Sequence, residues 1–142
     1  MFLELIVNDS ISTKIDFLKQ LGSDKFKHRN QSLLEHLIGV RDILKKWGAP
    51  EYVQDGGLFH SVYGTTYFKP QMTTDRDAVR YLIGEKAEEL AYWFCFLDEP
   101  RTQRIYNIEN EQLKKDLLLI DKANDEDMAN ASMMPWEESY GL

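Results

Sequence analysis

The stretch from Ser32 to Trp47, SLLEHLIGVRDILKKW, decides the fold. Its apolar residues recur three and four positions apart, which is the spacing of the core-facing stripe of an α-helix. The stripe consists of Leu33, Leu37, Val40, Leu44 and Trp47. Gly48 follows as a helix stop, and Pro50 stands where another helix begins. We therefore expect a core helix over residues 32–47.

The rest of the chain shows helical patterns with glycine or proline between them. Helices are predicted over residues 14–21, 51–62, 74–83, 85–97 and 110–124, with connections at 23–30 and 101–109. Within 51–62, the pair Gly56-Gly57 predicts a close helix approach or a local break. A short N-terminal segment is the one place with a strand pattern. The sequence thus predicts an all-α fold, a compact single domain over residues 1–142 with six or seven helices.

Composition excludes several classes of protein. The chain has 142 residues, and its single cysteine, Cys95, excludes an internal disulfide and a zinc site of paired cysteines. The net charge of −7 argues against nucleic acid as a partner. No apolar run is long enough to predict a membrane span. The apolar start, Met1 to Val7, is too short for a signal peptide, so we expect a cytoplasmic protein.

The three histidines, His28, His36 and His60, are the first candidates for chemistry. His36 lies in the 32–47 helix and His60 near the end of 51–62. Two antiparallel helices joined by a short turn can face these imidazoles toward each other. Imidazole is the commonest metal ligand in proteins. The alternative is a pair of buried histidines satisfied by hydrogen bonds, for which Ser61 and Tyr63 are the nearest candidates.

Four segments carry a family resemblance. They are Leu33 to Val40, Leu58 to Ser61, Ile83 to Leu90 and Leu119 to Asn124. Over residues 33–124 they resemble an HD-type phosphohydrolase domain. The similarity is greatest to the branch that hydrolyses guanosine tetraphosphate and to uncharacterised small bacterial HD-like proteins with His-Ser in place of His-Asp. The resemblance implies an HD-like helical core and metal ligands His36, His60 and Asp121. It also implies a Mn, Fe or Zn ion that assists hydrolysis of a small anionic, phosphorylated substrate.

Two departures from that family pattern leave alternatives open. Ser61 stands where the family has the aspartate of its His-Asp pair, and Gly64-Thr65 stands where the alarmone hydrolases have Glu-Asp. A metal-dependent hydrolase would use Ser61, Tyr63 and Thr65 around the reacting group. The alternatives are an inactive HD-like binding or regulatory module, and a metal-free enzyme that uses the histidines as acid and base.

Three further segments are open to two interpretations each. The basic run Lys27-His28-Arg29 is either the rim of a pocket for a small anionic molecule or a solvated loop. The aromatic run around Cys95, from Tyr92 to Phe96, predicts a core or a homodimer face, with Cys95 an inert core thiol. The segment Met133 to Trp136 either packs across the domain or binds a partner.

Overall fold

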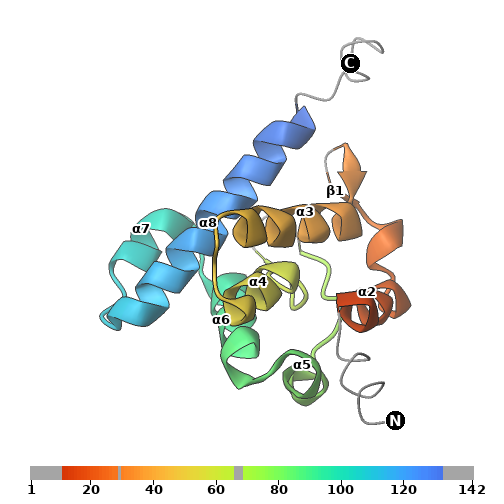
Figure 1. Cartoon of the computed structure of the whole chain (residues 1–142), viewed down its shortest axis with the longest axis horizontal. Helices are drawn as coiled ribbons and strands as arrows, with labels where there is room; N and C mark the ends of the chain where they lie inside the picture. Colours follow the sequence, from red (N-terminus) through yellow and green to blue (C-terminus); the bar gives the residue numbers. More distant parts are fainter. Residues whose placement is uncertain (1–10, 29, 66–68, 133–142) are drawn as a thin grey trace.

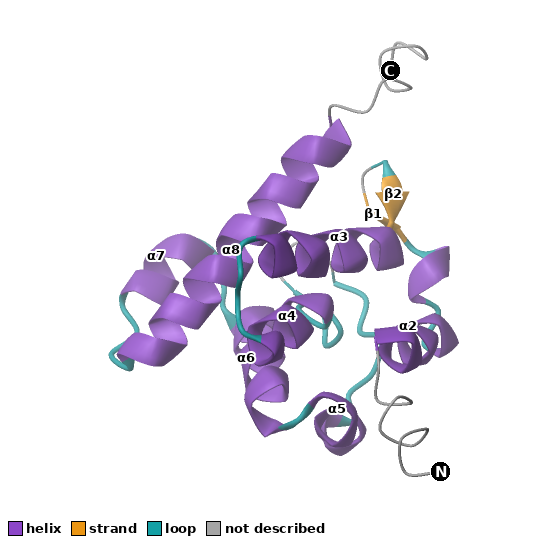
Figure 2. Cartoon of the chain, viewed as in Figure 1, coloured by secondary structure: helices purple, strands orange, loops and turns teal. Residues whose placement is uncertain are grey.

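Helix α3 (Leu33–Lys46) lies between the other helices and packs against α4 (Glu51–Leu58) and α8 (Glu111–Ser132), as Figures 1 and 2 show. The computed structural model describes residues 11–28, 30–65 and 69–132. The other elements in this part of the chain are α2 (Ile11–Gln20), a 3-10 turn (Ser23–Lys25), β1 (Lys27–His28), β2 (Gln31–Ser32), α5 (Arg76–Ile83), α6 (Glu85–Phe96) and α7 (Arg101–Tyr106). The all-α prediction is therefore confirmed, with seven α-helices among the described residues.

The start and stop of α3 follow from its sequence. Ser32 and Glu35 form a capping box: the Glu35 N–H donates to Ser32 Oγ at 3.0 Å, and the Ser32 N–H donates to Glu35 Oε1 at 2.8 Å. Gly48 follows the helix with a φ of 80°, which glycine adopts without strain. The predicted stripe is fully buried from Leu33 to Leu44. Trp47 was expected in the stripe, but it is 45% exposed because it lies beyond the last helical turn.

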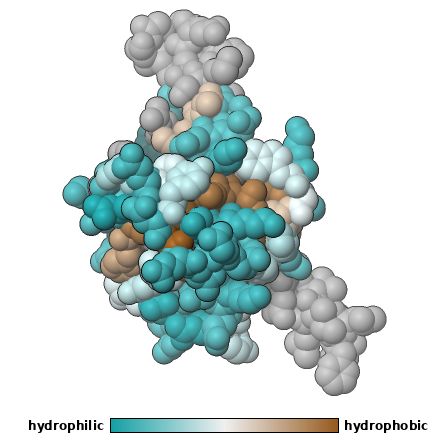
Figure 3. Space-filling model, turned by 90° about the vertical axis from the view of Figure 1, so that its left-hand side faces the viewer, coloured by the Kyte–Doolittle hydropathy of each residue, from teal (hydrophilic) through white to brown (hydrophobic). Residues whose placement is uncertain are grey.

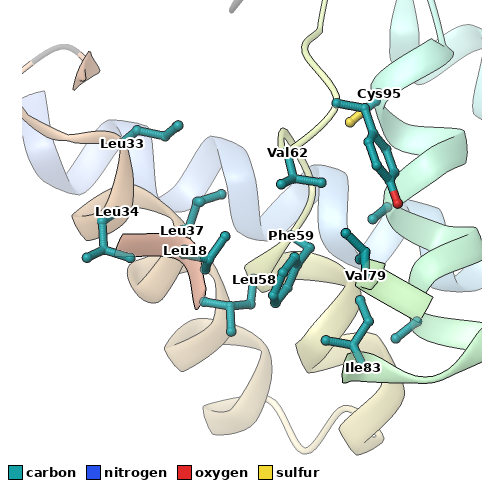
Figure 4. Close-up of a cluster of buried hydrophobic side chains, with 13 residues drawn as sticks. Leu18, Leu33, Leu34, Leu37, Leu58, Phe59, Val62, Val79, Ile83 and Cys95 are labelled. Atoms are coloured by element: carbon teal, nitrogen blue, oxygen red, sulfur yellow. The ribbon is translucent and has the colours of Figure 1, made fainter. Parts of the chain in front are cut away.

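The core consists of two adjoining apolar clusters. Figure 4 shows the first, in which side chains of α2, α3, α4, α5 and α6 meet around Phe59. The second joins α3, α4 and α6 to α7 and α8. The glycine pair of α4 permits this packing, because a Cβ on Gly57 would overlap Leu44 and a Cβ on Gly56 would lie 2.9 Å from Leu90 Cβ. Of the two interpretations of this pair, close helix approach is correct.

Several predicted boundaries were wrong. Helix α4 ends at Leu58 rather than at 62, because residues 59–64 form tight turns that finish at Gly64, whose φ is 86°. Helix α5 begins at Arg76 rather than at 74, because Asp75 caps it by accepting from the Ala78 N–H. The predicted connection at 101–109 contains α7, and α8 continues to Ser132 instead of ending at 124.

Strands β1 and β2 pair antiparallel, Lys27 with Ser32 and His28 with Gln31, where a loop was expected over 23–30. In the described part of the chain, each helix is too short or too polar to cross a membrane.

In the predicted aromatic run, Phe94 and Cys95 are buried in the core, whereas Phe96 is 58% exposed. The expected N-terminal strand and the segment Met133 to Trp136 lie outside the described residues.

Candidate site of three histidines and Asn124

The structure brings the three histidines together. His36 extends from the first turn of α3 and is fully buried, and His60 follows α4 and is 3% exposed. Their ring centroids are 5.1 Å apart, with the rings edge to face. His28, from strand β1, stacks flat on His36 with centroids 4.1 Å apart. The predicted approach of His36 and His60 is therefore present, although His60 lies in the turn after α4 rather than on a helix.

Hydrogen bonds fix the orientation of both buried imidazoles. His60 Nδ1 lies 2.7 Å from the carbonyl oxygen of Gly57, and His36 Nδ1 lies 2.6 Å from Asp127 Oδ2. A carbonyl and a carboxylate can only accept, so each Nδ1 carries a proton. In the neutral tautomers, both Nε2 atoms therefore present a lone pair. Histidines that bind metals commonly have this arrangement, with Nδ1–H held by a carboxylate or a carbonyl.

Both Nε2 atoms point at the side-chain amide of Asn124 on α8. Asn124 Oδ1 lies 2.8 Å from His36 Nε2 and 3.1 Å from His60 Nε2. Burial lowers the pKa of His60 well below its usual range, and the nearby His36 and Arg101 lower it further. His60 is therefore neutral at physiological pH. With His36 in the neutral tautomer that has its proton on Nδ1, three acceptor atoms converge on one point, and such a group requires either a cation or a hydrogen-bond donor between its members.

Asp121 is not the residue of α8 that faces the histidines. Its Oδ2 accepts from Thr102 Oγ1 at 2.7 Å, and its Oδ1 lies 3.9 Å from Arg101 Nη1. Asn124, about one turn further along α8, occupies the place where Asp121 was expected. Among the described residues, no three His, Cys, Asp or Glu side chains gather as a metal-binding group. The expected ligand set of His36, His60 and Asp121 is therefore not assembled in that form.

Asp127 on α8 fixes the orientation of His36. It lies beyond residue 124, where the last helix was expected to end, yet it is 8% exposed inside α8. Its Oδ2 accepts from His36 Nδ1 and from Gln31 Nε2 at 2.8 Å, so it ties the β-hairpin to α3 and α8. A Cβ on Gly39 would overlap the Asp127 carboxylate. The glycine of α3 therefore makes room for the group that orients His36.

A small cavity of about 30 Å³ opens beside the histidines. Its lining includes His28, His60, Ser61, Thr65 and Arg101. Ser61 is 3% exposed, and its Oγ has no hydrogen-bond partner among the described residues. A buried hydroxyl of this kind needs a partner from a ligand or from water.

The other predicted site residues lie elsewhere. The Tyr63 hydroxyl donates to Glu88 Oε2 at 2.7 Å, and it does not line the cavity. Burial and the neighbouring Glu88 raise the pKa of Tyr63, so it is a poor proton donor to a substrate. Lys27 is exposed and lines a separate depression with Asp24 and Glu35. Arg29 lies outside the described residues.

A larger groove of about 550 Å³ runs along α7 and α8. Tyr106, Leu118 and Leu119 contribute to its lining, together with lysines 114, 115 and 122. Figure 3 shows apolar surface bordered by hydrophilic side chains on the side of the molecule where α7 lies. No histidine lines this groove among the described residues. His28, His60 and Asn124 line the smaller cavity instead.

A family model described as a domain of unknown function (DUF6817) matches residues 17–99, which is more than half of the chain. The chain belongs to this family. The DUF6817 region contains His28, His36, His60 and Ser61, whereas Arg101, Asn124 and Asp127 lie beyond its matched end. No curated protein and no solved structure gave a match to the chain.

Sequence reasoning missed Arg101, Asn124 and Asp127. Arg101 lies in a region taken for a connection. For the α8 residues there was a signal: positions 117, 120, 124, 127 and 131 repeat at helical spacing, and all five are buried. The signal was obscured because two of these residues are polar and stand beside acidic neighbours. Positions 124, 127 and 131 nevertheless continue the buried face of α8 that begins with Leu117 and Ile120.

Proposed function

We propose that this protein binds one divalent cation between His36, His60 and Asn124 and uses it to hydrolyse a small anionic substrate. The single observation behind the proposal is the convergence of His36 Nε2, His60 Nε2 and Asn124 Oδ1. A cation at this point would satisfy all three lone pairs at once. The resemblance of residues 33–124 to HD-type phosphohydrolases supports the same chemistry.

The donor set fits zinc or iron. Two imidazoles and one amide oxygen are suitable ligands for these ions, and they leave coordination positions for water and substrate. When bound, the cation supplies Lewis acidity toward a phosphoryl or carbonyl oxygen. Asp127 holds His36 in the ligating tautomer, and the Gly57 carbonyl does the same for His60. His28 covers the His36 ring and limits access of water from that side.

The charge of the ligands sets the substrate class. Neither imidazole nor amide neutralises the cation, in contrast to sites with several carboxylate ligands. The nearby carboxylates are not among these ligands, because Asp121 pairs with Arg101 and Asp127 pairs with His36 Nδ1. A doubly charged cation would therefore leave the region positive, and an anionic substrate would be attracted to it.

The test is calorimetric titration of chelator-stripped protein with Zn²⁺. We expect about one equivalent for the unaltered chain and no binding for His60→Gln or Asn124→Leu. His28→Gln is the matched control, because it removes an imidazole that contributes no ligand, and it should retain the ion. Hydrolysis of p-nitrophenyl phosphate should require the ion and follow the same ranking. Absence of uptake by the unaltered chain, or uptake that survives His60→Gln, would contradict the proposal.

One observation favours a second candidate, a metal-free binding module. If the Asn124 amide is turned end for end, its two N–H groups can donate to the two Nε2 atoms at the same distances. The three side chains would then be satisfied without a cation. In this case the titration shows no uptake, and the cavity beside Ser61 serves to bind a ligand rather than to hydrolyse it.

A further inference from the structure

We infer that helix α8 is a self-association surface, on which a second copy of this chain packs antiparallel. The inference does not depend on the proposed cation site. Among the described residues α8 is the longest helix, and its last turns extend beyond α3 in Figure 1. Its buried side chains gather on one face, toward the core, whereas the opposite face is exposed. This exposed face is the surface to which the inference applies.

The exposed face of α8 forms a continuous row along the helix. Its members stand three or four positions apart and therefore lie one above another: Glu111, Lys115, Leu118, Lys122, Asp125 and Ala129. Leu118 is half-buried and the other five are exposed. The first half of the row also lines the groove of about 550 Å³ beside α7. Figure 3 shows apolar surface bordered by hydrophilic side chains on this side of the molecule.

Charge is divided between the two halves of this face. The first half carries lysines 114, 115 and 122, and the second half carries Asp125 and Glu126. The whole chain has a net charge of −7, so a group of three lysines on this acidic molecule attracts an acidic partner. The second half of the same helix, in another copy of the chain, has the charge that such a partner needs.

An antiparallel pair brings the two halves of α8 together. A two-fold axis beside position 120 places Lys114 and Lys115 of one copy opposite Asp125 and Glu126 of the other. The two-fold symmetry repeats this contact at the other end of the pair and closes the assembly as a dimer. A parallel pair in register would instead place lysines against lysines and carboxylates against carboxylates. The charge pattern therefore specifies both the partner and its direction.

The centre of the pair is apolar. In the same register, Leu118 of each copy lies beside Lys122 of the other, whose methylene stem can cover the leucine while its ammonium group stays in water. Tyr106 of α7, which is 60% exposed, borders this contact from the edge of the groove. Near the ends, Glu111 lies opposite the small Ala129, so no like charges meet there.

The size of the surface limits the affinity. Helix α8 has 22 residues and is about 33 Å long. Contact between two helix faces of this length buries less than the roughly 1,600 Å² of a standard protein interface. Exposed ion pairs contribute little each and are screened by salt. We therefore expect a dissociation constant of roughly 10–100 µM that rises with ionic strength.

The test is sedimentation equilibrium from about 5 to about 500 µM protein, a range that spans the expected dissociation constant. The unaltered chain should pass from monomer to dimer, and about 0.5 M NaCl should weaken the dimer several-fold. Lys114→Glu with Lys115→Glu should weaken association at least roughly 10-fold, and so should Asp125→Lys with Glu126→Lys. All four changes in one chain place opposite charges across the antiparallel pair again, so this variant should regain the dimer.

The matched control is Lys45→Glu with Lys46→Glu. Both lysines are exposed at the end of α3, and their reversal changes the net charge as much as reversal of the two α8 lysines does. The control should associate almost as the unaltered chain does. Far-UV circular dichroism of each variant checks that its helices are intact.

The possible results separate this surface from other occupants and other faces. A chain that stays monomeric at about 500 µM overturns the inference. A dimer that neither charge reversal weakens would use another surface, such as the one around the exposed Phe96. Weakening by the lysine reversal alone would mean that a different acidic segment contacts the groove. Failure of the variant with all four changes to associate would exclude the antiparallel register.

Discussion

Substitution of Gly39 by alanine tests the packing that supports His36. Glycine in the interior of a helix is less favourable than alanine by about 1 kcal/mol, so Gly39→Ala should stabilise an ordinary helix. In α3, however, the new methyl group would overlap the carboxylate of Asp127. The carboxylate must then move away from His36 Nδ1. Loss of the acceptor of a buried N–H costs about 1–3 kcal/mol, so after the helix gain we expect a net destabilisation of up to about 2 kcal/mol.

Equilibrium unfolding in urea measures this change, and a double-mutant cycle identifies its cause. In an Asp127→Ala background the overlap no longer exists. Gly39→Ala should then stabilise the protein by up to about 1 kcal/mol, so the sign of its effect should reverse. The reasoning is refuted if Gly39→Ala has the same effect in both backgrounds, or if it stabilises the unaltered chain. In the metal-loaded protein, Gly39→Ala should also lower cation affinity about 10- to 100-fold, because Asp127 would no longer hold His36 in its ligating orientation.

Three more changes test separate parts of the account. Asn124→Asp should raise Zn²⁺ affinity at least 10-fold by calorimetry, because two imidazoles and a carboxylate form a stronger ligand set; unchanged or weaker binding would show that α8 does not face the cation. Burial opposes ionisation of Glu88, but hydrogen bonds from Arg76 and Tyr63 outweigh it and lower the pKa of Glu88. Glu88→Gln should therefore destabilise the protein at pH 7, and the deficit in urea unfolding should shrink as the pH falls through the lowered pKa of the folded protein; a deficit independent of pH would contradict this. Burial raises the pKa of the Cys95 thiol to about 12, so a disulfide reagent at pH 8 should modify it only after unfolding, and rapid labelling of the folded chain would refute its core position.

The fold was predictable where apolar periodicity was strong. Helix α3 shows its stripe, its cap and its stop in the sequence, and the structure reproduces all three except at Trp47. Helix α7 was missed because it has only six residues, RTQRIY, and a single fully buried apolar side chain, Ile105. So short a segment has no recognisable period. The part of α8 beyond residue 124 was missed because the last helix was expected to end there, and sequence alone does not show that a buried histidine pairs with Asp127.

The site was predictable only in part for a related reason. His36 and His60 could be paired because a short connection between helices brings them together. Asn124 and Asp127 are about ninety residues from His36 in the sequence, and their roles depend on the register of α8 against α3. That register is set by packing of the second core cluster, which sequence periodicity does not specify. A shift of one turn along α8 separates the expected Asp121 from the observed Asn124.

The most direct test of the central claim is long-range ¹H–¹⁵N NMR of the imidazoles during titration with Zn²⁺. Before addition, Nδ1 of both His36 and His60 should carry a proton, and His60 should be neutral. One equivalent of Zn²⁺ should shift Nε2 of these two histidines and leave His28 Nε2 almost unchanged. If either histidine carries its proton on Nε2, or if the ion perturbs only His28, the cation site between His36, His60 and Asn124 does not exist.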